Sequence, residues 1–185
     1  MNRTTLALRF CIVLLAISFT TDVLAVDDAA ASRGAELLNP LKSNLKQALL
    51  AGLEKGPENA ITVCKEQAPA IANALSTDGV KVGRTSHLLR NQENTSPDWV
   101  TAVLEGYLTE GSDRAPTVVA LAEERVGYVE PIMIKPLCLT CHGEALAPGL
   151  ASRIKEDYPH DDATGFEVGD LRGVYWVEFP SLVTN

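Results

Sequence analysis

The order of periodic segments predicts an α+β fold in which helices pack against an antiparallel sheet. Apolar residues recur with a helical period of three to four in the first part of the chain, up to about residue 108. Runs rich in β-branched residues follow from residue 117 onward. The two kinds of segment do not alternate as βαβ units would require, so a doubly wound parallel sheet is disfavoured.

The first 25 residues are typical of a secretory signal peptide. Arg3 and Arg9 supply positive charge, residues 10–19 form an apolar core, and Val23-Leu24-Ala25 fits a cleavage site. The apolar core is too short to span a bilayer, so an uncleaved anchor is the weaker interpretation. We therefore expect one mature domain over residues 26–185, exported to the periplasm or to another lumen across the membrane from the cytoplasm.

The chain is acidic, with a net charge of −8. Removal of the signal segment would make it one unit more negative, because that segment holds two arginines and one aspartate. Such a charge disfavours nucleic acid and anionic membrane surfaces as partners. It would favour a basic partner, although solubility alone accounts for it more simply. No later apolar run approaches transmembrane length.

Leucines at helical spacing predict a helix over most of residues 30–54. Pro40 lies inside this pattern, so either the helix is kinked there or Asn39 caps a helix that starts at Pro40. A second helix is predicted over residues 57–75. Its apolar stripe turns Cys64 inward, and a proline at position 69 would bend it locally.

A third helix and several strands complete the predicted elements. Ser96-Pro97-Asp98 predicts the cap of the third helix, which should end at Gly111. A short helix is expected around residues 148–158, between the last two predicted strands. The remaining segments are predicted as strands: 79–85 (a short strand or merely extended), 117–122 (helix being the alternative), 128–134 and 173–179. A charged turn joins the second and third of these.

The most specific motif in the chain is Cys138-Leu139-Thr140-Cys141-His142. Two cysteines three residues apart, followed directly by histidine, form the attachment pattern of a c-type haem. The thiols of Cys138 and Cys141 would form thioethers to the two vinyl groups, and His142 would be an axial iron ligand. A thioredoxin-like dithiol and a zinc half-site are the alternatives, but neither a βαβ context nor a second ligand pair is evident. We therefore expect one covalently attached haem c.

The second axial ligand is less evident from the residues. Cys64 is the thiol left over in a chain expected in an oxidising compartment, which favours a ligand role, but packing as a small buried hydrophobe remains open. Three competing ligands are His87, Met133 and His160. Met133 lies in a predicted strand, where core packing is the simpler role. The two histidines lie in polar segments, where exposure is the default.

Haem carboxylates need cationic partners, and three arginines are candidates: Arg84, Arg90 and Arg172. A guanidinium group pairs a carboxylate bidentately, but each of these residues also fits an ordinary surface or structural role. Three aromatic residues, Trp99, Tyr107 and Trp176, fit either a haem-facing surface or the core.

Several segments together resemble a known family, the single-haem c-type proteins of a domain-of-unknown-function family with a PAS-like fold, found in cyanobacteria and proteobacteria. The resemblance covers nearly the whole mature chain and rests on the order of six segments: Ala60-Ile61-Thr62-Val63-Cys64, Gly83-Arg84-Thr85-Ser86, Arg90-Asn91, Cys138-Leu139-Thr140-Cys141-His142-Gly143, Tyr158-Pro159-His160-Asp161 and Gly169-Asp170-Leu171-Arg172-Gly173. The resemblance implies a PAS-like antiparallel sheet with N-terminal and flanking helices around the haem. It further implies that His142 and Cys64 are the two axial ligands.

Two function classes follow from this resemblance. One is a sensor of redox state or of a diatomic gas, which would act through a separate signalling partner because the chain carries no kinase, cyclase or methyl-acceptor region. The other is a periplasmic electron carrier with an unidentified redox partner. An enzyme is not expected, since no acid–base pair of the kind that cleaves peroxide can be assigned.

Overall fold

The computed structural model describes residues 22–109 and 111–181, and only the backbone of residues 22–26. The predicted signal segment lies mainly outside this part, and its last four residues belong to the first helix. Five α-helices, one short 3-10 turn and four strands follow one another in the described part: α1 (Asp22–Leu53), α2 (Pro57–Leu75), β1 (Lys81–Thr85), α3 (Asp98–Leu108), β2 (Thr117–Leu121), β3 (Arg125–Met133), η1 (Pro136–Cys138), α4 (Leu139–His142), α5 (Pro148–Asp157) and β4 (Leu171–Pro180).

The four strands form one antiparallel sheet with the order β1-β4-β3-β2. The last strand is therefore central, although it is the farthest along the chain. A tight turn joins β2 to β3, with Glu123 and Glu124 at φ angles of 57° and 53°. The predicted α+β class with an antiparallel sheet and flanking helices is confirmed.

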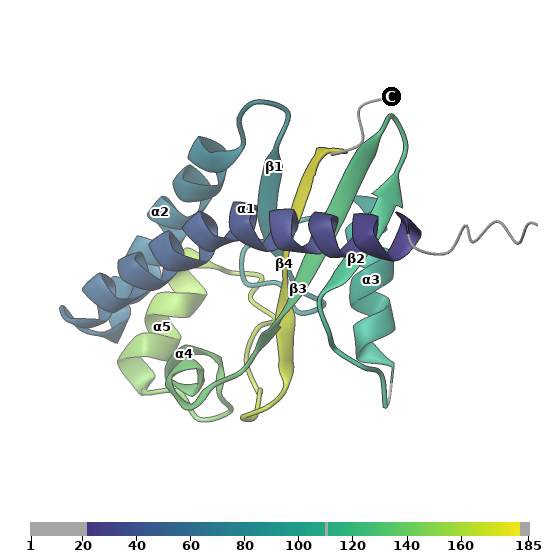
Figure 1. Ribbon diagram of the computed structural model, residues 1–185. Coiled ribbons are helices and arrows are strands. Elements are labelled where there is room, and N and C mark those ends of the chain that lie inside the picture. The colour runs from purple at the N-terminus through teal and green to yellow at the C-terminus, as the bar shows by residue number, and fades with distance from the viewer. Residues whose placement is uncertain (1–21, 110, 182–185) are drawn as a thin grey trace, which may run out of the picture.

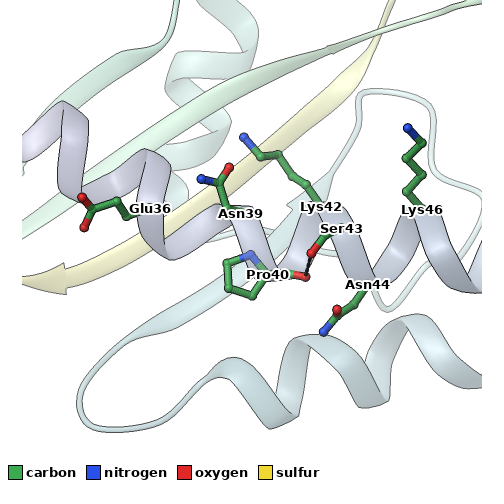
Figure 2. A pocket seen from close by; sticks show the side chains of 7 residues that line it. All are labelled: Glu36, Asn39, Pro40, Lys42, Ser43, Asn44 and Lys46. Carbon is green, nitrogen blue, oxygen red and sulfur yellow. Dashed lines mark hydrogen bonds between the residues drawn. The ribbon is translucent and has the colours of Figure 1, made fainter.

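Helix α1 runs across one face of the sheet (Figure 1). Its leucines Leu38 and Leu41 are almost fully buried against sheet residues such as Val177 and Phe179. Pro40 lies inside α1, so the alternative in which Asn39 caps a helix that starts at Pro40 is wrong. The side chains of Asn39, Pro40 and Ser43 face solvent, and the Ser43 hydroxyl donates to the Pro40 carbonyl at 3.1 Å (Figure 2). The hydrogen bond that proline forfeits is thus lost on the exposed side, where it costs least.

Helix α3 covers the opposite face. Val129 and Val174 point away from α1 because successive side chains alternate along a strand, and both are fully buried against Val100 of α3. Trp99 and Trp176 pack in the same cluster with their rings edge to face, 6.2 Å between centroids. These tryptophans therefore have the core role and do not line the cavity described below.

Two glycines admit the large rings on this face. A Cβ atom at Gly83 would lie 2.5 Å from the ring of Trp176, and one at Gly127 would lie 2.6 Å from the ring of Trp99. Any side chain at either position would overlap an aromatic ring. The absence of a side chain at these two glycines thus allows the tryptophan rings to pack against the sheet.

The predicted elements are largely confirmed. Helix α2 has the predicted bounds, 57–75, and the four strands overlap the predicted ones. The predicted capping segment Ser96-Pro97-Asp98 does begin α3, with Pro97 at the cap position, but no side chain caps the helix, and the Ser96 hydroxyl bonds instead to that of Thr101 at 3.1 Å. The helix also ends at Leu108, before the predicted stop at Gly111. Among the described residues, no helix is long and apolar enough to cross a membrane.

Candidate functional site

A cavity of about 240 Å³ lies on the α1 side of the sheet. Five parts of the fold enclose it: the C-terminal end of α1, α2, the sheet, the loop after β1, and the stretch from η1 to the end of α5. It contains every predicted site residue, namely Cys64, Arg84, Arg90, Cys138, Cys141, His142 and Arg172. The fold therefore brings together residues separated by more than a hundred positions.

The Cys138–His142 segment folds as two short helical turns, η1 and α4. Pro136 begins the first turn, and the backbone N–H of Gly143 closes the second on the carbonyl of Leu139 at 3.0 Å. Residues three and four apart share one face of a helix. This spacing turns Cys138, Cys141 and His142 together toward the cavity.

The imidazole of His142 is held in a defined orientation. Its Nδ1 lies 2.7 Å from the carbonyl oxygen of Ala163, which can only accept, so Nδ1 carries the proton. Burial and the positive charges of Arg172 and Arg90 lower the pKa of His142 to about 3. The ring is therefore neutral near pH 7, with the lone pair of Nε2 free to bind a metal.

Cys64 lies on α2 and lines the same cavity as the motif cysteines. The three cysteines are free and half-buried. Burial raises the pKa of the Cys64 thiol, and the charges of Arg84 and Arg90 partly oppose this rise. The predicted inward orientation of Cys64 is confirmed, and its sulfur sits in a partly dry, positively charged environment.

One ion pair and one side-chain hydrogen bond connect α2, the helix that carries Cys64, to α5. Asp157 of α5 accepts from Lys65 of α2 at 2.9 Å and from Arg153 at 2.6 Å. Arg153 also donates to the hydroxyl of Thr62 at 2.9 Å. Apolar contacts between the same helices lie beneath these bonds. The position of Cys64 relative to the motif thus depends on α5.

The three candidate arginines differ in what they contact. Arg172 donates to the Ser86 hydroxyl at 2.7 Å and stacks over the ring of Phe166, 5.4 Å from its centroid. Arg90 is engaged with Asp161 and with main-chain carbonyls. The side chain of Arg84 makes no hydrogen bond to the described residues, although its backbone belongs to the β1–β4 ladder. Its guanidinium group is thus the one that remains available to a carboxylate in the cavity.

The competing ligand candidates lie elsewhere. His160 and His87 are exposed, and neither lines the cavity. Met133 packs with the α3-side cluster. All three thus have the simpler roles that their sequence context favoured.

Sequence reasoning gave no role to three residues at this site. Tyr158 and Tyr175 line the cavity, and burial raises the pKa of both phenols, to about 12 for Tyr158. Asp161 lies behind it, paired with a buried arginine. Tyr158 and Asp161 belong to a segment that carried the family resemblance, which was the available signal for them. Tyr175 lay in a predicted strand without any distinguishing signal.

A second hollow follows the exposed side of α1 around Pro40 (Figure 2). All the side chains that line it come from this one helix, so it is an open surface with no opposing wall. It contains none of the predicted site residues. Within the part of the chain that the structure describes, no group of three or more His, Cys, Asp or Glu side chains is placed to hold a bare metal ion, as the zinc alternative would require.

Fold and site together define an α+β protein with a cavity lined by thiols, an imidazole and arginines. The family model described as Tll0287-like matches residues 19–180, and the chain belongs to this family. Among solved structures, the chain is similar to the crystal structure of the cyanobacterial heme-protein Tll0287. The two are 26% identical, the match covers 78% of this chain and 93% of that one, and the TM-score is 0.53. No curated protein matches the chain.

Proposed function

We propose that this chain is an exported c-type haem protein that senses redox state or a diatomic gas. The observation that carries the proposal is the convergence of the Cys138–His142 motif and Cys64 on one cavity. The similarity to a cyanobacterial heme-protein supports haem as the occupant. A bound haem would supply a one-electron couple and an iron that can take a gaseous ligand.

The donor set of the cavity fits this group. Cys138 and Cys141 would each add a thiol across one vinyl group, with sulfur bonding to one carbon and the thiol proton passing to the neighbouring carbon, so no oxidant would be required. His142 offers an unprotonated Nε2 because its Nδ1–H is already bound to a carbonyl. A porphyrin brings four nitrogens of its own, so two protein ligands complete the coordination of its iron.

Cys64 is the proposed second axial ligand. As a thiolate it carries negative charge and stabilises the more oxidised iron, so we expect a lower potential than that of a His/Met cytochrome. Reduction weakens the electrostatic attraction that holds the sulfur. Cys64 is therefore expected to dissociate from the iron in the reduced protein, which would free a coordination position. Because Cys64 is part of α2, its dissociation would alter the position of α2 and its contacts with α5.

Arginines on the polar side of the cavity are the proposed partners of the haem carboxylates. Arg84 is best placed, because no hydrogen bond to the described residues engages it, whereas Arg90 and Arg172 already bond to the protein. A bidentate guanidinium–carboxylate pair also fixes orientation, which suits a group attached through only one of its edges.

A periplasmic electron carrier is the alternative function. The overall acidity of the chain favours it with a basic redox partner. The two functions differ in what Cys64 does: a carrier keeps its coordination during turnover, whereas a sensor changes it. No covalent catalysis is proposed.

Attachment is tested first. The full chain is produced in a host that exports it and attaches c-type haem, and the mass of the purified protein is measured. We expect the mature chain plus one haem, with visible absorbance that survives acid denaturation. A chain with the bare mass and no retained absorbance would contradict the proposal.

Sensing and electron transfer are then separated with the haem-loaded protein. The reduced protein is titrated with carbon monoxide while visible spectra are recorded. We expect rapid binding in the wild type, because Cys64 has left its position. Slow or absent binding, together with fast electron exchange, would favour the carrier.

A further inference from the structure

The loop from Asp161 to Phe166 supports the Cys138–His142 motif from behind. The carbonyl of Ala163 accepts from Nδ1 of His142 at 2.7 Å. The backbone N–H of Phe166 donates to the carbonyl of His142 at 3.0 Å, and that of Gly165 donates to the carbonyl of Gly143 at 3.3 Å. The orientation of the imidazole thus depends on where this loop sits.

One buried side chain, Arg90, ties the loop to the motif. Its Nη2 donates to the carbonyl of Cys141 at 2.6 Å and to that of Ala163 at 3.2 Å. Its Nε and Nη2 form a two-point pair with Asp161, at 3.0 and 3.1 Å. The side chains of Arg90 and Asp161 are only 10% and 8% exposed. Asp161 also accepts from the backbone N–H of Ala163 at 3.0 Å.

We propose that Arg90, oriented by Asp161, is a positioning residue for His142. Arg90 holds the Ala163 carbonyl where it can accept a hydrogen bond from the Nδ1–H of His142. At the same time Arg90 bonds to the Cys141 carbonyl. The histidine is thereby kept in one tautomer, with Nε2 toward the cavity. This inference rests on the proposed function only in taking His142 as an iron ligand.

Arg90 also limits how strongly the imidazole donates electrons. The Ala163 carbonyl shares its lone pairs between the Nδ1–H of His142 and a cation, so it accepts less strongly from His142 than a free carbonyl would. Loss of Arg90 would act in two ways: while the loop is closed, the hydrogen bond from Nδ1–H to the Ala163 carbonyl would be stronger, and the loop would open more often, which speeds exchange of the Nδ1 proton. The first effect raises ligand basicity and stabilises oxidised iron.

A lysine could not do the same work. Arg90 contacts a carboxylate and two carbonyls, which requires the planar fork of a guanidinium group. An ammonium group is a point charge on a flexible stem and would keep the ion pair without holding both carbonyls. Arg90→Lys therefore separates charge from geometry.

The test compares variants of the full chain. Arg90→Gln alone would leave the Asp161 carboxylate buried without its partner, so the main variant is the double change Arg90→Gln with Asp161→Asn, which buries no unpaired charge. Arg125→Gln is the matched control. Arg125 likewise pairs a carboxylate, Glu178 at 2.6 Å, and bonds a carbonyl, that of Gly79 at 2.6 Å, but it does not line the cavity.

Two quantities are measured on the purified proteins. Nitrogen-15 NMR follows hydrogen exchange of the His142 Nδ1–H, and a redox titration gives the midpoint potential. We expect the double variant to exchange this proton roughly ten-fold faster or more, because losing the charge-assisted hydrogen bond from Arg90 to the Ala163 carbonyl makes opening of the loop easier by about that factor. Its potential should shift to a more negative value, and Arg125→Gln should change neither quantity.

A folded double variant with the wild-type exchange rate and potential would overturn the proposal. Should that variant not fold, Arg90→Lys decides the matter: faster exchange with the charge retained supports positioning, and wild-type exchange overturns it. A bare-chain mass would instead overturn the proposed function. The exchange measurement needs no haem, so it still tests how Arg90 acts on His142.

Discussion

The apolar cluster beneath α3 and the cavity on the α1 side are stabilised in different ways. On the α3 face, Val100, Val129 and Val174 are fully buried in an apolar cluster. On the cavity side, reactive and charged side chains are held by hydrogen bonds to main-chain carbonyls, as Arg90 and His142 are. The α3 cluster contributes mainly to the stability of the fold. At the cavity, the hydrogen bonds orient a few functional side chains.

This difference predicts that substitutions in the α3 cluster and substitutions at the cavity alter different measured quantities. A core change on the α3 face should lower the free energy of unfolding and leave cofactor attachment intact. A change in the motif should abolish cofactor attachment and leave the free energy of unfolding nearly unchanged. The following variants are ordered from the largest expected effect to the smallest.

The double change Cys138→Ser with Cys141→Ser should abolish covalent attachment of haem completely. Serine hydroxyls do not form thioethers, and the positions are only half-buried, so the fold should persist. The check is the mass of the purified protein, with circular dichroism as the control for folding. Covalent haem retained by this variant would show that attachment occurs elsewhere.

Leu104→Ala on α3 should lower the free energy of unfolding by ~2–5 kcal/mol, because it leaves a cavity in a packed cluster. Leu104 is 5% exposed. Leu108 on the same helix is 41% exposed, so Leu108→Ala is the matched control and should have a much smaller effect. Chemical denaturation measures both. Equal losses for the two variants would contradict the packing described here.

Gly83→Ala should cost ~1–3 kcal/mol of stability through overpacking. The new methyl group would meet the ring of Trp176 at 2.5 Å. Gly106→Ala is the control, because nothing lies within 4 Å of a Cβ atom there. Gly106 lies in the last turn of α3, so Gly106→Ala should stabilise the protein by at most ~0.5–1 kcal/mol. A neutral Gly83→Ala would mean that Trp176 does not lie against β1.

Lys65→Met should have the smallest effect and lower the free energy of unfolding by ~0.2–1 kcal/mol. Lys65 is 46% exposed where it pairs with Asp157, so water screens the interaction. Lys46→Met, at an exposed position of α1, is the control for loss of one positive charge. Thermal unfolding at low and high salt should show the difference between the two shrinking as salt rises.

Local patterns predicted most of the elements and the centre of the site. Leucine periodicity located α1 and α2, and the Cys138–His142 spacing located the motif. Both depend only on neighbours a few residues apart. The uninterrupted passage of α1 through Pro40 could not be decided locally, because packing of the helix on the sheet outweighs one lost hydrogen bond.

The support of the site was not predictable from sequence patterns. Arg90 and Asp161 are 71 positions apart, and the acceptors at Cys141 and Ala163 are main-chain carbonyls, which have no residue signature. The sequence offered Arg90 as a partner for haem carboxylates, a role that stays a prediction. Its contacts with the motif backbone became evident only once the loop after α5 was placed.

The central claim is that Cys64 and His142, which line the same cavity, would both bind the iron of one haem. The most direct measurement is electron paramagnetic resonance of the oxidised, haem-loaded protein, comparing the wild type with Cys64→Ala. The account predicts a low-spin thiolate signal in the wild type and its loss in the variant, with covalent haem retained in both. Identical low-spin signals in the two proteins would contradict it, and Cys64 would then be a packing residue of α2.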